Sequence, residues 1–145
     1  MGLPALAIGA NVAEGEIYFF TDQCPVGIPD HPHVLLRHKE KYLFLNTCSS
    51  SLDTAIRLAQ VRNWPIDSYP IVRKNNVNKL TDDSYVNCNE YIELTEEQFG
   101  VLYKNGYIHR EKGGGVMEEA DMIRIRHGID ISLNITDEDK EWILR

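Results

Sequence analysis

Short apolar runs, each closed by turn-forming or charged residues, set the strongest limit on how this chain folds. The first three runs cover residues 15–20, 33–36 and 42–45. Runs of this length, rich in aromatic and aliphatic side chains, predict strands rather than long helices. None approaches the roughly 18 apolar residues of a membrane-spanning helix, and residues 2–13 lack the basic flank of a signal peptide. We therefore expect a soluble, cytoplasmic protein with no membrane partner.

Helix-capping residues stand between and after these runs. Ser50 or Ser51 is suited to begin a helix, because a serine side chain accepts a hydrogen bond from the first free backbone N–H groups. Thr95 and Gln98 have the spacing of a capping box, in which two side chains satisfy each other's backbone donors. Thr136 is suited to begin a last short helix. The sequence therefore predicts helices inserted among strands and appended to them.

The length of 145 residues is typical of one domain, so we expect residues 1–145 to fold as a single unit. Two more strands are expected at 69–72 and 85–92, whereas residues 116–127 fit either a helix or a strand. Together these elements predict a mainly β protein with helices (α+β), arranged as a small barrel or a curled sheet.

Three consecutive glycines, residues 113–115, form a flexible joint before a C-terminal extension that covers residues 112–145. This extension has enough apolar side chains to pack on the rest of the fold or on a second subunit. The residues expected to dock are Val116, Ala120, Ile123, Trp142 and Leu144. An alternative is that its carboxylates cover a basic groove and imitate an anionic ligand.

The net charge of −7 is unevenly distributed along the chain. Residues 1–80 hold eight Lys and Arg against seven Asp and Glu, whereas residues 81–145 hold seven against fifteen. The acidic part is typical of a solvated helical surface. The nearly neutral first part is free to bind an anion such as a nucleic-acid backbone.

The three cysteines, Cys24, Cys48 and Cys88, are odd in number and far apart, which predicts a reducing compartment and no disulfide framework. No Cys-x-x-Cys or His-Glu-x-x-His spacing indicates a metal centre. The glycine triplet lacks the Lys-Ser or Lys-Thr ending of a phosphate-binding loop. We therefore expect no metal and no cofactor.

The densest group of titratable side chains lies between residues 31 and 39. His31 and His33 are candidates for a general base and a general acid, because histidine titrates closest to neutral pH. Arg37 or Lys39 is a candidate to stabilise the charge on a phosphate. The alternative is that both histidines only support the junction between a loop and a strand.

Small hydroxyl and thiol side chains fill residues 46–51. Thr47 and Ser49 are candidates to donate hydrogen bonds to a phosphate, whereas Cys48 would need a lowered pKa to act as a nucleophile. A helix cap beside a buried thiol is the structural alternative. Arg73 and Lys74 begin a basic, amide-rich segment suited to single-stranded nucleic acid or to an exposed loop.

The order of the motifs resembles that of the MazF/PemK-like toxins over about residues 14–105. Residues 15–18 (Gly-Glu-Ile-Tyr) are similar to the family's opening strand, and residues 31–36 are similar to its Arg-Pro-x-x-Val strand after a long loop. The next strand ends at Thr47, where the family has a Thr-Ser pair. Residues 80–86 are similar to a later Leu-x-x-Asp-Ser motif and strand.

The resemblance implies an SH3-like β-barrel core over residues 14–105, followed by the C-terminal extension. It implies a homodimer that cleaves single-stranded RNA at specific sequences without metal and is neutralised by an antitoxin protein. His31 occupies the position of the family's catalytic arginine, and Thr47 that of its threonine. We therefore expect His31, His33 and Thr47 to be catalytic, and Arg37, Lys39, Ser49, Arg73 and Lys74 to bind substrate.

A second hypothesis is a non-catalytic binding module on the same barrel. The missing arginine and the acidic second half of the chain favour it. The barrel is shared by ribonucleases and by gyrase-poisoning toxins of the CcdB type, so the fold alone does not choose between RNA and a protein partner such as gyrase.

Overall fold

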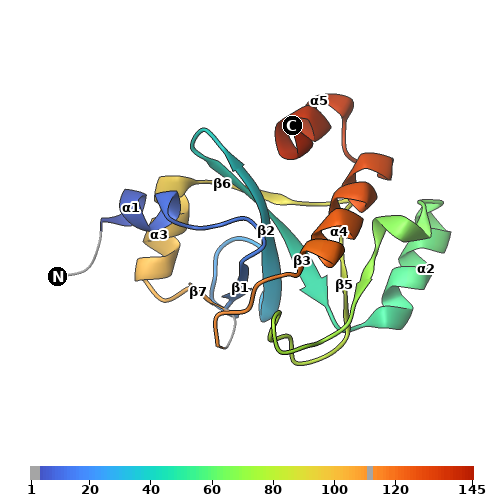
Figure 1. Ribbon diagram of the computed structural model, residues 1–145, viewed down its shortest axis with the longest axis horizontal. Helices are drawn as coiled ribbons and strands as arrows, with labels where there is room; N and C mark the ends of the chain where they lie inside the picture. Colours follow the sequence, from blue (N-terminus) through green and yellow to red (C-terminus); the bar gives the residue numbers. More distant parts are fainter. Residues whose placement is uncertain (1–3, 111–112) are drawn as a thin grey trace.

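The computed structural model describes residues 4–110 and 113–145. Their strands form one seven-stranded antiparallel sheet in the order β4-β5-β3-β2-β1-β7, with β6 also paired to β3 (Figure 1). The strands are β1 (Ile17–Phe20), β2 (His31–Lys39), β3 (Tyr42–Ser49), β4 (Ile71–Val72), β5 (Ser84–Val86), β6 (Ile92–Thr95) and β7 (Ile108–Arg110). In the described residues no strand pairing joins β4 to β7, so the sheet is open. The α+β class is confirmed, and a closed SH3-like barrel stays a prediction.

Helices lie on both faces of this sheet and beyond its β4–β5 edge (Figure 1). They are α1 (Ala5–Ala10), α2 (Leu52–Arg62), the short 3₁₀ turn η1 (Ile66–Ser68), α3 (Glu96–Lys104), α4 (Glu119–Ile131) and α5 (Asp137–Leu144). Within the described residues, none of these helices is long and apolar enough to cross a membrane.

The long β2–β3 hairpin is the centre of the sheet. β2 pairs with β3 from His33 opposite Thr47 to Lys39 opposite Tyr42, with one bulge at Leu36. Residues 37–39 belong to β2, so the tight turn is confined to Glu40 and its neighbour. Glu40 has φ 59, in the left-handed region that such turns use.

One face of the sheet is covered by α3, with α1 packed against α3. Leu35, Leu45 and Phe99 are fully buried in this core. The two helices touch through glycines: a Cβ at Gly9 would overlap the Glu96 carbonyl, and a Cβ at Gly100 would overlap the Ala5 carbonyl. Neither α1 nor β7 was predicted from the sequence.

The opposite face is covered by α4 and α5 (Figure 1). Ile125 and Ile129 of α4 and Ile143 of α5 are buried against the strands. The prediction that the C-terminal extension packs on the rest of the fold is confirmed, but of the expected side chains only Leu144 packs against the core. Val116, Ala120, Ile123 and Trp142 are exposed, and Leu144 is half-buried.

The glycine triplet is a packed turn rather than a loose joint. Gly113 and Gly114 have positive φ values of 77° and 76°. Gly115 is buried, and a Cβ there would overlap the carbonyl oxygen of Asn78. Its own carbonyl accepts a hydrogen bond from the Ile17 N–H at 3.1 Å, which joins this turn to β1. Residues 111 and 112 lie outside the described residues.

An asparagine–serine cluster joins the loop before β6 to η1 and to the end of α4. It consists of the buried Asn89, Ser68 and Ser132, together with the exposed Asn134. The Asn89 amide donates to the Ser68 hydroxyl at 2.9 Å and accepts from the Ser132 hydroxyl at 2.7 Å. The Asn134 side chain donates to the Asn89 carbonyl at 2.7 Å. These bonds hold the C-terminal helices at one position on the sheet.

Local signals predicted several elements correctly. The capping box of Thr95 and Gln98 begins α3, and Thr136 caps α5. Residues 119–131 are a helix, which settles the ambiguity over 116–127. The single strand expected over 85–92 is instead two short strands, because β5 ends at Val86 and β6 begins only at Ile92.

Candidate functional site

A pocket of about 210 Å³ lies where β2 begins and β3 ends. Polar side chains dominate its wall, together with a few apolar ones. The lining residues are Phe19, Asp30, His31, Pro32, Cys48, Ser50, Leu80, Thr81, Asp82 and Ser84. We call this cavity the His31 pocket.

The His31 pocket brings together three of the sequence segments singled out above. Residues 30–32 enter from the long loop and the start of β2, residues 48–50 from the end of β3, and residues 80–84 from the segment before β5. Antiparallel pairing explains this convergence, since β3 lies between β2 and β5 in the sheet. Segments that are separated in the sequence therefore meet at one end of the sheet.

His31 has one ring nitrogen fixed and one available. Its Nδ1 lies 2.7 Å from the carbonyl oxygen of Pro29. A carbonyl oxygen only accepts hydrogen bonds, so Nδ1 carries the proton and the neutral ring keeps its lone pair on Nε2. No other described residue bonds to Nε2. The neutral ring, which lines the pocket, therefore has one nitrogen that can accept a proton.

His33 is a structural histidine. It is fully buried, its ring is stacked on Phe20 with 3.9 Å between the ring centroids, and both of its nitrogens are used. Nδ1 donates to the His31 carbonyl at 2.9 Å, and Nε2 accepts from the Ile28 N–H at 3.3 Å. Burial lowers the pKa of His33 to about 4. The expected general-acid role does not fit this environment, because the ring is neutral at pH 7 and has no free nitrogen.

Thr47 and Ser49 lie on β3 near the pocket but do not line it. Thr47 is half-buried directly opposite His33, and Ser49 is buried next to Cys48. The Ser49 hydroxyl accepts a bond from the Ser51 N–H at 3.4 Å. The expected His31–Thr47 pair is therefore not assembled within the pocket, and Ser50 is the hydroxyl residue that reaches it from β3.

Arg37 lies at the other end of β2. Six residues along a strand span about 20 Å, so this side chain is far from His31. The Arg37 guanidinium donates to the Arg145 carbonyl at 2.6 Å, which fixes it to the end of the chain. Lys39 is two residues further along β2, and its side chain lies outside the described part of the structure. The structure does not bring Arg37 to the pocket.

Arg73 and Lys74 lie beside the pocket, at the turn between β4 and β5. The Arg73 guanidinium forms an exposed ion pair with Asp83 at 3.0 Å, and the backbone N–H of Lys74 donates to the same carboxylate at 2.9 Å. These contacts, the backbone bond first, hold the pKa of Asp83 below its usual range. Asp83 therefore anchors the turn, whereas its neighbour Asp82 faces the pocket.

Sequence reasoning did not identify Asp30, Asp82 and Phe19 as site residues. Asp82 stands at a variable position of the Leu-x-x-Asp-Ser resemblance, whose aspartate is Asp83, so the motif carried no signal for it. Phe19 reaches the site because it pairs with Pro32 across β1 and β2. Asp30 has φ 58 at the end of the long loop, and no sequence pattern specifies that conformation.

The pocket thiol is not a candidate nucleophile. Cys48 is buried, and the nearby Cys88 has a pKa raised by burial first and by the Cys48 sulfur second. The Cys88 thiol donates to the Ile125 carbonyl at 3.4 Å, on the inner side of α4.

Across residues 4–110 and 113–145, no group of three or more His, Cys, Asp or Glu side chains is arranged to hold a metal ion.

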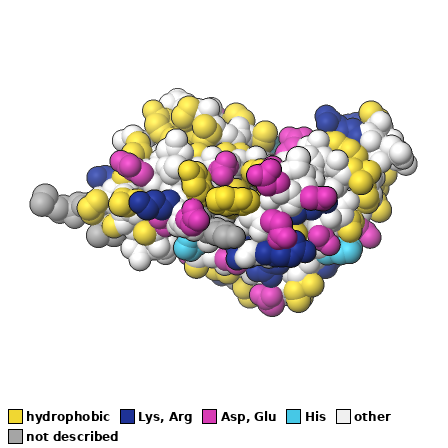
Figure 2. All heavy atoms as spheres, turned by 90° about the horizontal axis from the view of Figure 1, so that it is seen from above, with side chains coloured by type: hydrophobic (Ala, Val, Ile, Leu, Met, Phe, Trp, Pro, Cys, Tyr) yellow, Lys and Arg dark blue, Asp and Glu magenta, His cyan; other side chains and the backbone are white. Residues whose placement is uncertain are grey.

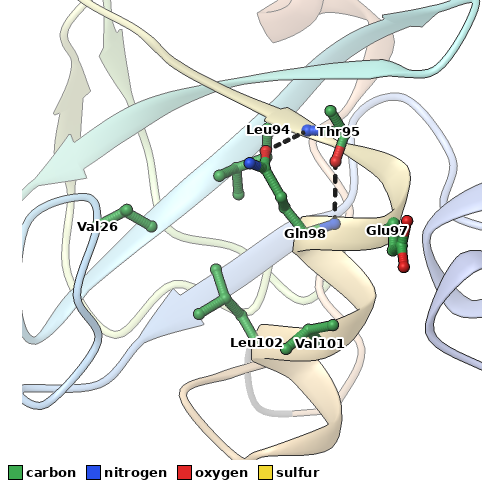
Figure 3. Close-up of a pocket in the computed structure, with 7 residues that line it drawn as sticks. All are labelled: Val26, Leu94, Thr95, Glu97, Gln98, Val101 and Leu102. Carbon is green, nitrogen blue, oxygen red and sulfur yellow. Dashed lines mark hydrogen bonds between the residues drawn. The ribbon is translucent and has the colours of Figure 1, made fainter.

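A second, larger hollow of about 560 Å³ lies between α3 and the loop after β1 (Figure 3). Its apolar wall consists of Val26, Leu94, Val101 and Leu102. The polar groups of Thr95 and Gln98 bond to one another's backbone, as the dashed lines in Figure 3 mark. This α3 groove therefore offers an apolar contact surface and little chemistry.

In the comparisons with known proteins, no protein-family model matches the chain, and no similar sequence was found among curated proteins.

Proposed function

We propose that this protein is a toxin-like endoribonuclease that cleaves single-stranded RNA without a metal ion. One observation carries the proposal: the His31 ring, with its Nε2 lone pair available, stands in a pocket where three segments of the resemblance to MazF/PemK-like toxins converge. The sequence resemblance further suggests a homodimer and an antitoxin partner, both of which belong to this proposal.

In the proposed reaction, His31 Nε2 removes the proton from a ribose 2′-hydroxyl. The 2′ oxygen bonds to the adjacent phosphorus, and the bond from phosphorus to the 5′ oxygen breaks. The products are a 2′,3′-cyclic phosphate and a 5′-hydroxyl, whose proton comes from solvent. A positioned general base of this kind accelerates a reaction by about 10²–10⁴-fold.

The Ser50 hydroxyl and the exposed Arg73 guanidinium are candidates to contact the RNA backbone. Ser50 reaches the pocket wall. Arg73 is 77% exposed and lies beside Asp83, next to the lining residue Asp82. An exposed guanidinium contributes to phosphate binding in a salt-dependent way. Arg37 has no part in this version of the site, because it is held at the far end of β2.

The test is incubation of the purified protein with a long mixed-sequence RNA in EDTA. We expect cleavage by the wild-type protein and a loss of about 100-fold or more in His31→Ala. The matched control is His127→Ala, which removes an exposed histidine from α4 far along the chain from the pocket. No cleavage by the wild type, or equal cleavage by His31→Ala, contradicts the proposal.

A non-catalytic module that binds a protein partner such as gyrase is the second candidate. The α3 groove favours it, because this groove is larger than the His31 pocket and mainly apolar. Expression in a bacterial host separates the candidates: growth arrest with intact RNA and altered DNA supercoiling supports the second, and growth arrest with cleaved RNA supports the first.

A further inference from the structure

The charge of the His31 pocket is opposite to what a phosphate needs. Asp30 and Asp82 both line the pocket, and none of its described lining residues is Lys or Arg. Two carboxylates in a small cavity repel a phosphate, whose binding draws on cationic groups. If RNA binds here, its backbone therefore lies outside the cavity, and an uncharged part of the nucleotide lies inside.

The two carboxylates are also free hydrogen-bond acceptors. The side chains of Asp30 and Asp82 bond to no other described residue. Asp83 gives the contrast within the same segment, since Arg73 and the Lys74 N–H occupy its oxygens. Acceptors that the protein does not use are available to N–H groups of a ligand.

Part of the pocket lining is apolar. Phe19, Pro32 and Leu80 supply apolar walls, and Phe19 itself stacks with His109 at 5.3 Å between ring centroids. Unpaired RNA bases are bound in this way, with a ring face on aromatic or apolar side chains and the base edge on polar groups. A cavity of about 210 Å³ leaves room for one base rather than for a longer segment.

We propose that the His31 pocket receives one unpaired nucleobase and selects guanine, whose Watson–Crick edge presents adjacent N–H donors to the Asp82 carboxylate. The inference rests on the proposed RNA substrate and adds its base preference. Uracil presents one N–H donor between two acceptors, so the carboxylates repel its oxygens. The bound base places its ribose at the pocket mouth, beside His31.

The experiment uses six-residue oligonucleotides that differ in one central base and carry 2′-O-methyl groups, so that binding is measured without cleavage. We expect guanine to bind about tenfold or more tightly than uracil, the range of a good two-point base contact. Hypoxanthine, which lacks the guanine amino group, binds between the two. Asp82→Asn abolishes the guanine preference.

Asp83→Asn is the matched control, with the same chemical change one residue away. We expect it to keep the ratio of guanine to uracil affinity, even where loosening of Arg73 changes both affinities together. Equal binding of all four bases, or equal binding of an oligonucleotide without the central base, overturns the inference. Cleavage of RNA with no base preference supports the proposed ribonuclease and contradicts the guanine pocket. Selective binding of guanine without any cleavage supports the guanine pocket and contradicts the ribonuclease.

Discussion

Two polar clusters in this protein are built from similar residue types and have opposite arrangements. In the asparagine–serine cluster, the Asn89 side chain and backbone bond to Ser68, Ser132, Asn134 and Asn87. In the His31 pocket, the lining side chains of Asp30 and Asp82 bond to no described residue, and His31 keeps Nε2 available. The first cluster is closed by its own partners, and the second presents groups to a ligand.

This difference separates structural from functional polar residues better than residue type does. A buried polar group with all its partners stabilises one arrangement of the chain, because any opening leaves several donors and acceptors unpaired at once. Polar groups without protein partners contribute little to folding and are available for recognition. Acidic side chains also surround hydrophobic ones on the face seen from above (Figure 2).

The largest effect is expected at the centre of the asparagine–serine cluster. Asn89→Ala removes the Asn89 side chain that bonds to the buried Ser68 and Ser132 hydroxyls. Each hydroxyl then keeps one bond, because Ser68 donates to the Pro65 carbonyl and Ser132 accepts from the Asn134 N–H. We expect a loss of about 3 kcal/mol in the free energy of unfolding, measured by urea denaturation. Asn76→Ala, at an exposed asparagine, is the control and should change it by less than about 0.5 kcal/mol. A loss below about 1 kcal/mol in Asn89→Ala would contradict the structural role.

The next effect is a pH dependence that comes from His33. Its pKa is about 4 when folded and 6.5 when unfolded, so the unfolded chain takes up a proton at higher pH than the folded chain does. Stability is therefore complete above pH 6.5 and is lost as the pH falls toward 4. We expect a loss of about 2 kcal/mol between pH 7 and pH 5 from this residue.

Denaturation of the wild type and of His33→Gln at pH 7 and pH 5 measures this contribution. Glutamine does not titrate, so we expect the variant to be less stable at pH 7 but to lose about 2 kcal/mol less on acidification. The same pH slope in both proteins would assign the dependence to other groups.

The contrast between His31 and His33 also shows what sequence could predict. Both residues are in the same short motif, and the sequence favoured a catalytic role for both. Packing decides which ring is satisfied: the His33 ring stacks on Phe20 and accepts a bond from the Ile28 N–H of the long loop. Those contacts depend on packing between distant segments, and no local pattern encodes them.

Local chemistry predicted what depends on neighbouring residues. The Thr95 capping box and the Thr136 cap are correct because each involves residues three apart. The prediction of which face of α4 docks was wrong, because residues 116–127 were compatible with both a helical and a strand periodicity. The helix that forms buries Met122 and Ile125 instead of Ile123. α1 was missed because its position depends on the close approach of Gly9 and Gly100 to neighbouring backbone.

A smaller loss of stability is expected when a hydrogen-bonded side chain at the surface is removed. Thr95→Ala removes the hydroxyl that accepts from the Gln98 N–H at 3.0 Å and ends the capping box of α3. We expect a loss of about 1 kcal/mol, measured by urea denaturation. Thr54→Ala, an exchange of the same residue type within α2, should change stability by only a few tenths of a kcal/mol. Equal losses of stability in Thr95→Ala and Thr54→Ala would contradict a stabilising role of the cap.

The smallest effect on folding is expected in the His31 pocket. The double change Asp30→Asn and Asp82→Asn removes two like charges that have no described partner, and asparagine tolerates the positive φ of 58° at residue 30 as well as aspartate does. Since the removed interaction is a repulsion, we expect the variant to equal the wild type or to gain a few tenths of a kcal/mol at low salt. The gain should vanish in high salt, because salt screens exposed charges. A loss of more than about 1 kcal/mol would mean that these carboxylates hold the fold together, and the contrast between the two clusters would then fail at the pocket.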